Sequence, residues 1–464
     1  MVQVCHFLPA LSALNRLWGV STYQLDWTGR ADAEAAAHTH PRAQVGYVGV
    51  LGDTSAEAAP APSGTATPAQ THPTLPPTGS MVIEGDNLDA LKHLRQTHKD
   101  RVSVVYIDPP YNTGNALPYR DTFGVAGHAG WMSMMLPRLI VARDLMRKDG
   151  VIFVSIDDRE HAFLTLVGHQ VFGEENFLGS FVHQRARGGG QARTWIRGHD
   201  YIAVWAKDAS LVDGFWQEKR PPAKYETIDG ARYLVEDDVL RTTFGRYERG
   251  TERRLMYEDI EAVRGPAKKA QVDAWLAAGT HILRPWGDGK HAVVRITPAE
   301  QAASKMYSIV RALGHEGRND LEALGLGGLF TYPKPVSLMR TLVRSRTFFD
   351  PEAVVLDFFA GSGTTAQAVM ELNAEDGGRR EFILVQKPEV LRPSTGELDS
   401  KVAVSTAEVT DSDAGSPAAG ATDSITISEL ARRRVVAAAN AVGCDPATIT
   451  DVRLTGEPQQ RDGL

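Results

Sequence analysis

The sequence predicts an α/β protein with a mainly parallel sheet that is interrupted by an inserted domain. Short apolar runs rich in β-branched residues alternate with stretches in which leucine or methionine recurs at helical spacing. Two of these runs, 102–107 and 353–356, are each followed directly by an aspartate. Open α/β sheets bind their ligands at the carboxyl ends of such strands. The stretch between them, about 184–328, loses the alternation, which is typical of an insertion.

Bulk composition excludes several classes of protein. A chain of 464 residues has room for two or three domains, and its formal net charge of −7 provides no general attraction to nucleic acid. Binding to DNA would therefore need local basic patches. Cys5 and Cys444 lie at opposite ends of the chain without metal-binding or disulfide spacing, which fits a reducing cytoplasm. No apolar run is long enough to span a bilayer, so we expect no membrane association.

The first elements are predicted in chain order. Residues 1–80 are expected to form a flexible low-complexity leader, with short structure allowed within 1–28. Ala, Pro, Thr and Gly dominate after residue 30, and such residues bury too little apolar surface to offset the entropy lost on ordering. A strand at 81–83 precedes leucines at helical spacing. A helix over 131–148 should stop at Gly150, before a buried strand at 151–156.

The same alternation returns after the insertion. The pattern predicts a helix at 336–346, a strand at 353–357, a helix at 364–372 and a strand at 381–386. Residues 398–424 are again low in complexity, and a helix at 427–442 is expected near the end of the chain.

The segment 357–365 combines a strand end, a glycine turn and a helix start. Gly361 and Gly363 let the backbone approach a ligand closely, and the helix N-terminus offers N–H groups to an anion. Gly-x-Gly alone is weak evidence for a ligand site, because tight strand–helix turns occur in many α/β proteins. The third glycine of a dinucleotide-binding motif is also missing. The preceding acid and Phe359 favour a small nucleoside-like ligand.

The Asp-Pro-Pro-Tyr segment at 108–111 is more specific. If the segment were only a proline-rich end of a strand, neither the aspartate nor the tyrosine ring would be needed. The exocyclic amine of a nucleobase is a poor nucleophile, because its lone pair is delocalised into the ring. A carboxylate and a carbonyl that each accept one N–H favour the pyramidal amine that can attack. Asp108 and the carbonyl of Pro109 supply these acceptors on a rigid loop, and Tyr111 offers a stacking face. Such a base must be rotated out of the duplex.

Together the two motifs resemble those of amino-group DNA methyltransferases, which use S-adenosylmethionine. The catalytic motif precedes the glycine motif, as in the β class, and the whole set is similar to Mod subunits of type III restriction–modification systems. The strings that carry this similarity are 85–88, 106–114, 154–158, 332–335 and 357–365. The resemblance covers about 81–187 and 329–390, with a looser match at 427–442. It implies a Rossmann-like methyltransferase sheet with an inserted target-recognition domain, and methylation of the N6 amine of adenine in DNA.

The resemblance also implies roles for individual residues. The catalytic set is Asp108, Pro109, Pro110 and Tyr111. The cofactor-binding set is Asp86, Asn87, Lys334, Pro335, Asp357, Phe359, Ala360, Gly361, Ser362, Gly363, Thr364, Thr365 and Gln386. Asp86 should contact the adenine of the cofactor, and 359–365 its methionine part. Gln386 stands where the family usually has an acid for the ribose hydroxyls. No metal is expected, because the sulfonium is already activated.

The predicted domains follow from these assignments. They are a leader (1–80), a catalytic half (81–187), a target-recognition domain (188–328), a cofactor-binding half (329–397), a linker (398–424) and a C-terminal helix with a tail (425–464). Four arginines around the triple glycine are candidates for contacts with DNA phosphates, with a solvated loop as the alternative: Arg185, Arg187, Arg193 and Arg197.

Partners and rival functions are also implied. The resemblance implies double-stranded DNA as the substrate, a homodimer, and a Res-like restriction subunit that uses ATP. Cytosine N4 methylation shares the logic of the loop, but cytosine enzymes often have serine where this chain has Asp108. A DNA-binding module without turnover is a second alternative. A nicotinamide-dependent oxidoreductase would need a third glycine and an acid at Gln386, and this sequence lacks both.

Overall fold

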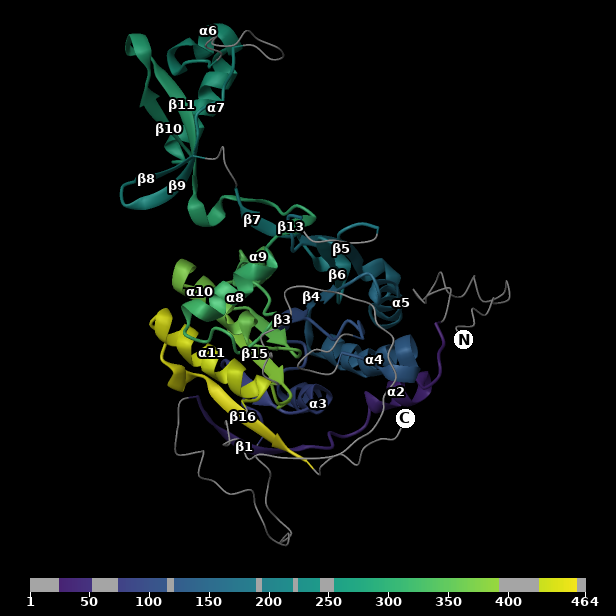
Figure 1. Cartoon of the computed structure of the whole chain (residues 1–464). Coiled ribbons are helices and arrows are strands. Elements are labelled where there is room, and N and C mark those ends of the chain that lie inside the picture. The colour runs from purple at the N-terminus through teal and green to yellow at the C-terminus, as the bar shows by residue number, and fades with distance from the viewer. Residues whose placement is uncertain are drawn as a thin grey trace, which may run out of the picture. The chain divides into compact units, whose positions relative to one another are not determined.

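The computed structural model describes residues 25–51, 74–114, 121–188, 194–219, 224–242, 254–391 and 425–456. Contacts divide the chain into two compact units. The first comprises Met1–Gly214 and Tyr307–Leu464, and the second comprises Phe215–Met306 (Figure 1). All predicted site residues belong to the first unit. No helix of the described residues is long and apolar enough to cross a membrane.

Ten strands of the described residues form one sheet in the first unit, in the order β1-β16-β2-β15-β14-β3-β4-β6-β5-β13. The six neighbours from β16 to β4 run parallel, while β1 and β6 run antiparallel to the strands beside them. The strands are β1 (Gln44–Val50), β2 (Met81–Glu84), β3 (Val102–Ile107), β4 (Met146–Ile156), β5 (Phe177–Gln184), β6 (His199–Ala206), β13 (Ile309–Arg311), β14 (Val354–Asp357), β15 (Glu381–Gln386) and β16 (Thr450–Thr455). A mainly parallel sheet was predicted and is confirmed.

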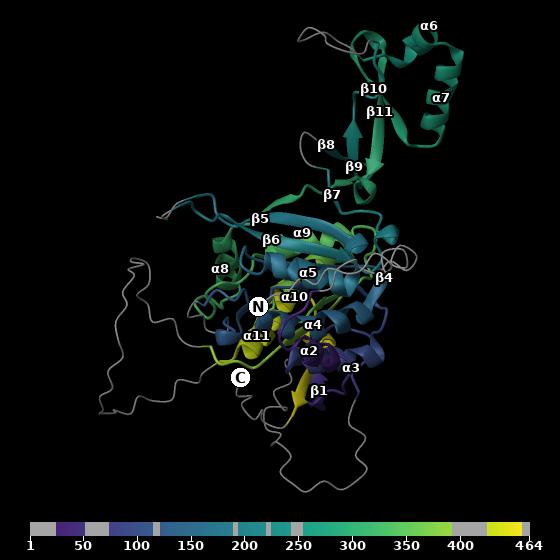
Figure 2. The same ribbon diagram turned by 90° about the vertical axis from the view of Figure 1, so that its right-hand side faces the viewer.

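Helices cover both faces of this sheet (Figures 1 and 2). One layer consists of α2 (Arg30–Ala36), α3 (Asn87–Thr97), α4 (Gly127–Leu145) and α5 (His161–Phe172). The other consists of α8 (Gly314–Ala323), α9 (Val336–Thr347), α10 (Thr364–Asp376) and α11 (Ile427–Ala441). Because both faces are covered, the central strands are mostly apolar, and every residue of β3 and β14 is buried, including the polar Ser103 and Asp357.

Part of the predicted leader is folded, so the prediction of flexibility is wrong for 29–51, which contains α2 and β1, while short structure was expected within 1–28. Leu25, Trp27 and Val45 are buried in the main core, and the indole Nε1 of Trp27 donates to Ser133 Oγ of α4 at 2.8 Å. The composition averaged over the leader conceals these few large side chains. Residues 1–24 and 52–73 lie outside the described part of the chain.

Two further boundaries differ from the prediction. Gly150 does not stop a helix: α4 ends at Leu145, and Gly150 is a buried residue within β4. The predicted C-terminal tail contains β16, which enters the sheet between β1 and β2. Arg432 of α11 fixes this region, because it donates to Glu84 of β2 at 2.6 Å and to Asp451 of β16 at 2.8 Å.

The second unit has a separate fold. Its four-stranded antiparallel sheet has the order β10-β11-β9-β8, and β12 pairs with β7. The elements are β7 (Trp216–Glu218), β8 (Lys224–Ile228), β9 (Ala231–Glu236), α6 (Ile260–Arg264), α7 (Pro266–Ala277), β10 (His281–Pro285), β11 (His291–Pro298) and β12 (Ala303–Lys305). The predicted insertion, 188–328, is wider than this unit, because β6, β13 and α8 belong to the first unit.

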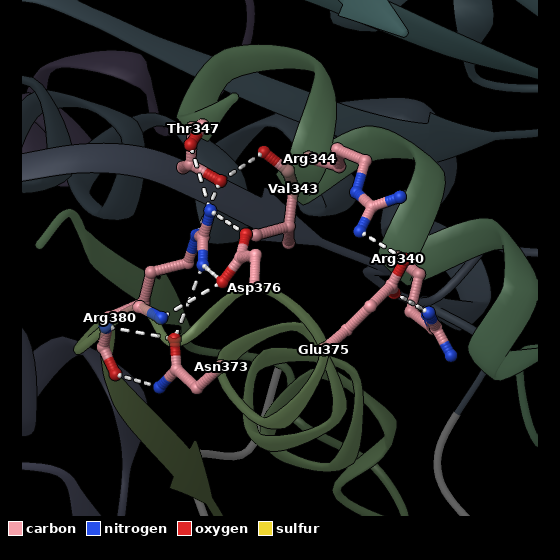
Figure 3. A network of polar contacts seen from close by, with 9 residues as sticks. Arg340, Val343, Arg344, Thr347, Asn373, Glu375, Asp376 and Arg380 are labelled. Atoms are coloured by element: carbon pink, nitrogen blue, oxygen red, sulfur yellow. Dashed lines mark hydrogen bonds and ion pairs between the residues drawn. The ribbon is translucent and has the colours of Figure 1, made fainter. Parts of the chain in front are cut away.

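Helices α9 and α10 are joined by a polar network (Figure 3). Arg340 and Arg344 of α9 both pair with Glu375 of α10, the second at 2.8 Å. The fully buried Arg380 side chain donates to Asp376 at 2.8 Å and to Thr347 at 2.8 Å. These contacts fix the relative position of the two helices whose N-terminal ends border the site described next.

Candidate active site

The carboxyl ends of four neighbouring strands meet at one edge of the sheet. Asp86 follows β2, Gln386 ends β15, Asp357 ends β14 and Asp108 follows β3. The edge borders a cavity of about 670 Å³, within the roughly 300–1,000 Å³ that is usual for ligand sites. Its lining includes Asp86, Asn87, Asp108, Pro110, Lys334, Asp357, Phe359, Ala360, Gly361, Ser362, Thr364, Thr365 and Gln386. Folding therefore brings together the two motifs that are far apart in the sequence.

Asp108 lies at the centre of a hydrogen-bonded triad. Its Oδ1 accepts a hydrogen bond from the Tyr111 hydroxyl at 2.8 Å and lies 3.0 Å from Lys334 Nζ. The same Lys334 nitrogen donates to the Tyr111 hydroxyl at 2.8 Å. Burial, followed by the charge of Asp108, raises the pKa of Tyr111 well above its ordinary value, so the hydroxyl remains a donor. The sequence did not predict that Lys334 contacts the catalytic loop.

Asp121 anchors the loop that follows the prolines. Its buried carboxylate accepts backbone N–H bonds from Tyr111 at 2.7 Å, Asn112 at 3.1 Å and Thr113 at 3.0 Å. The carbonyl of Pro110 accepts a bond from the fully buried Trp131 indole at 2.7 Å. The loop is thus held from outside, rather than by the rigidity of its prolines alone.

Replacing Asp121 with alanine is expected to release the three amides. Bonds to charged acceptors contribute roughly 1.5–3 kcal/mol each, so amide exchange at Tyr111, Asn112 and Thr113 should accelerate roughly 10- to 100-fold. Hydrogen–deuterium exchange measures this directly. Asp144→Ala, which removes a half-exposed acid near the end of α4, is the control and should leave these amides unchanged. Unchanged exchange in Asp121→Ala would refute the anchor.

The glycine turn has the geometry that its sequence predicts. Gly361 and Gly363 both have positive φ, 53° and 82°. The amide of Gly361 donates to Gln386 Oε1 at 2.7 Å, and Gln386 Nε2 donates to the Lys387 carbonyl at 3.2 Å. Both ends of the Gln386 amide therefore contact the protein itself while the residue lines the cavity.

Asp357 is almost fully buried beneath the turn. Its carboxylate accepts bonds from Thr365 Oγ1 at 2.5 Å and from the Phe359 amide at 3.1 Å. Burial raises the pKa of Asp357 to about 7, a rise that these two hydrogen bonds oppose and the charge of Asp108 reinforces. The acid therefore changes its charge near neutral pH.

Arg434 of α11 supports the turn from behind, a role that its sequence context does not indicate. Its fully buried guanidinium donates to Ser362 Oγ at 2.9 Å and to Thr364 Oγ1 at 2.7 Å. Burial lowers the pKa of Arg434 to about 10. Three arginines stand side by side at 432–434, and composition does not indicate which of them faces inward.

Asp86 and Asn87 lie at the start of α3, where a second unpredicted arginine contacts them. Asp86 caps the helix by accepting the Leu88 amide at 2.9 Å. Arg138 of α4 approaches Asp86 at 3.4 Å and donates to Asn87 Oδ1 at 2.5 Å. Burial alone would raise the pKa of Asp86, but the Arg138 charge and the Leu88 amide lower it below its ordinary value.

Three of the predicted DNA-binding arginines, Arg185, Arg187 and Arg197, lie in the connection between β5 and β6, at the same sheet edge as Asp108. Arg185 pairs with Asp200 at 3.1 Å and Arg197 with Asp158 at 3.7 Å, with about half of each arginine side chain exposed. Arg187 is also exposed. Arg193 lies outside the described residues, and the role of all four in DNA binding stays a prediction.

Comparison with known proteins agrees with this arrangement. Residues 102–392 match the DNA methylase family model (N6_N4_Mtase), and the chain belongs to this family. It is 31% identical over 376 residues to the EcoPI type III Mod subunit of Escherichia phage P1, covering 67% of this chain and 58% of that subunit. It is 30% identical over 355 residues to the type II methyltransferase M.KpnI of Klebsiella pneumoniae, covering 67% of this chain and 81% of that enzyme. The predicted family and fold class are thereby confirmed.

Coverage differs among the relatives. The chain spans only 53% of the StyLTI type III Mod subunit of Salmonella typhimurium, to which it is 31% identical over 355 residues, covering 68% of this chain. The crystal structure of the PvuII DNA methyltransferase (cytosine-N4-specific) is 14% identical, covers 68% of this chain and 84% of its own, and gives a TM-score of 0.36.

Proposed function

We propose that this protein is a site-specific DNA methyltransferase that transfers a methyl group from S-adenosylmethionine to the N6 amine of adenine in duplex DNA. It would act as a Mod-like subunit of a type III system or as an orphan enzyme. The observation that carries the proposal is that the amine-binding loop and the glycine turn border one cavity, from the adjacent strands β3 and β14.

The cavity fits the cofactor chemically. Bound S-adenosylmethionine supplies an activated methyl group on a positively charged sulfur. The cavity offers carboxylates from Asp86 and Asp357 and aromatic rings from Phe330, Tyr332 and Phe359, all of which suit a cation. Gly361 and Gly363, with their positive φ, let the turn approach the ligand. In this proposal Asp86 and Asn87 face the cofactor adenine, and 359–365 its methionine part.

The loop activates the amine by accepting both of its hydrogens. One acceptor is the Asp108 carboxylate, which the Tyr111 hydroxyl orients. The second is the carbonyl of Pro109, since Trp131 already binds the carbonyl of Pro110. The Tyr111 ring stacks on the extruded base. The new N–C bond would form as the methyl carbon leaves the cofactor sulfur. The nitrogen would then carry positive charge until one of its N–H protons leaves, and the nearby Asp108 carboxylate would stabilise that charge.

The proposal extends to the substrate and the partners. The exposed arginines Arg185, Arg187 and Arg197 would contact DNA phosphates beside the catalytic edge. The second unit, Phe215–Met306, lies within the predicted target-recognition domain and would contribute to the choice of sequence. The named type III relatives are Mod subunits of restriction–modification enzymes, and we extend the proposal to a Res-like partner, a homodimer and a cytoplasmic location.

Product analysis tests the proposal. Purified protein, S-adenosylmethionine and DNA of mixed sequence are incubated, and the digested nucleosides are examined by mass spectrometry. We expect N6-methyladenine, and sequencing of the modified DNA should give the recognition site. N4-methylcytosine alone would reassign the base. Cofactor binding without any methylated base would instead favour a DNA-binding module.

A further inference from the structure

Lys334 contacts the amine-binding loop although it belongs to the segment that leads into α9. Its Nζ lies 3.0 Å from Asp108 Oδ1 and 2.8 Å from the Tyr111 hydroxyl. The same nitrogen lies 5.1 Å from the centre of the Tyr111 ring. An ammonium donor therefore occupies the acceptor that the target amine needs.

The backbone of Lys334 is fixed while its side chain is long and flexible. Prolines precede and follow it, Pro335 caps α9, and its carbonyl accepts a bond from Thr364 Oγ1 at 3.3 Å. The four-carbon stem allows the ammonium to leave Asp108 without movement of the helix. Of the two donors on Asp108 Oδ1, Lys334 is thus the one that can be displaced, because Tyr111 belongs to the anchored loop.

Charge makes this displacement necessary for the transfer. The attacking nitrogen gains positive charge, and an ammonium 3.0 Å from the stabilising carboxylate would offset much of its field. An ammonium at that position also competes for the Asp108 oxygen with an N–H of the incoming amine.

We propose that Lys334 is a displaceable counter-ion of Asp108: it occupies the amine site in the free enzyme, and the extruded adenine replaces it. This inference rests on the proposed function. Lys334 is then a positioning residue that keeps Asp108 and Tyr111 in place until the base arrives. It opposes capture of the base instead of promoting it.

The direction in which a Lys334 variant changes capture of the target base distinguishes a displaceable counter-ion from a lysine that contacts DNA phosphate. A lysine that binds phosphate would weaken DNA binding when its charge is removed. A displaceable counter-ion predicts the opposite, so Lys334→Met should capture the target base more readily. Lys334→Arg should capture it less readily, because a guanidinium can hold a carboxylate with two parallel bonds.

The test uses a duplex with 2-aminopurine beside the target adenine, at the site given by sequencing. Fluorescence rises as the adenine leaves the stack. Without cofactor, we expect the ratio of extruded to stacked base to be about tenfold higher for Lys334→Met than for wild type, which is about 1.4 kcal/mol. Lys148→Met, at an exposed position in β4, is the matched control and should behave as wild type.

Purine in place of the target adenine removes the amine that competes with Lys334. On this second duplex the gain of Lys334→Met should disappear. An equal gain on both duplexes, no gain, or a loss of extrusion would overturn the proposal. Lys334→Gln provides a second uncharged variant should the methionine variant fail to fold.

A measurement without DNA separates this inference from the proposed function. In a double-mutant cycle of Lys334→Met and Asp108→Asn, thermal unfolding should show coupling between the two side chains. Absence of coupling would overturn the inference even for an active adenine methyltransferase. Coupling in a protein that yields no N6-methyladenine would instead locate the failure in the proposed function.

Discussion

Replacing Asp108 with alanine is expected to lower DNA methylation by roughly 10²–10⁴-fold. The change removes the acceptor that holds the amine and the negative charge that stabilises the attacking nitrogen. Cofactor affinity should stay within a few-fold of wild type, because the glycine turn is held separately by Gln386 and Arg434. Single-turnover methylation and calorimetric binding of the cofactor measure the two effects separately.

Two companion variants separate the contribution of the Asp108 charge from that of its hydrogen bond with Tyr111. Asp108→Asn keeps a carbonyl acceptor but loses the charge, so its activity should lie between those of alanine and wild type. Tyr111→Phe keeps the ring but removes the hydroxyl that donates to Asp108, and a smaller loss is expected. Asp144→Ala serves as the control for removing an exposed acid elsewhere. An alanine variant at 108 that methylates at the wild-type rate would eliminate the catalytic assignment.

The sheet edge could be predicted because its signals are local. A continuous apolar run marks a strand that is buried on both faces, and the acid that ends it marks the carboxyl edge. Val102–Ile107 and Val354–Asp357 both have this form, and the structure places them side by side. A glycine turn before a helix is equally local. These features required no knowledge of distant contacts.

The strands that the sequence did not predict correctly have weak or misleading local patterns. The edge strand β1 buries only one of its seven residues, and glycines at 46 and 49 interrupt its larger side chains. β16 contains threonines, an aspartate and an arginine, and its buried aspartate, Asp451, pairs with Arg432 of α11 and with Arg453. In β4 a glycine occupies a buried position within the strand, although glycine usually marks a stop.

The missed site residues depend on contacts between segments that are far apart in the sequence. Lys334 was expected to bind the cofactor, and its sequence motif contains nothing that points to Asp108. Asp121 acts through the backbone of residues 111–113, which no side-chain pattern records. Arg138 is partly buried and Arg434 fully buried, on helices that residue spacing assigns only to the core. Composition predicts neither their orientation nor their partners.

Asp357 is expected to make folding stability depend on pH in the direction opposite to that of a salt-bridged acid. Burial raises its pKa in the folded protein from an ordinary value of 3.8 to about 7. As pH rises, the unfolded chain therefore loses this proton first, whereas the folded protein keeps it until about pH 7. The contribution to stability is complete below about pH 4, declines between 4 and 7, and is lost above 7. The interval is about three pH units at about 1.4 kcal/mol each, so the change is on the order of 4 kcal/mol.

Asp357→Asn isolates this contribution, because the amide resembles the neutral acid. Its oxygen can accept the Phe359 amide, and its NH₂ can donate to Thr365 Oγ1, which preserves both native contacts. Urea unfolding at pH 5 and pH 8 should show wild type losing several kcal/mol relative to the variant between the two pH values. Asp144→Asn replaces a half-exposed acid, and its free energy of unfolding should change between pH 5 and pH 8 as that of wild type does. A wild-type-to-variant difference that is the same at pH 5 and pH 8 would mean that Asp357 is already charged in the folded protein. The carboxylate beneath the turn would then be a permanent anion facing the cofactor cavity, and the cavity would keep its affinity for a cationic ligand at every pH in this range.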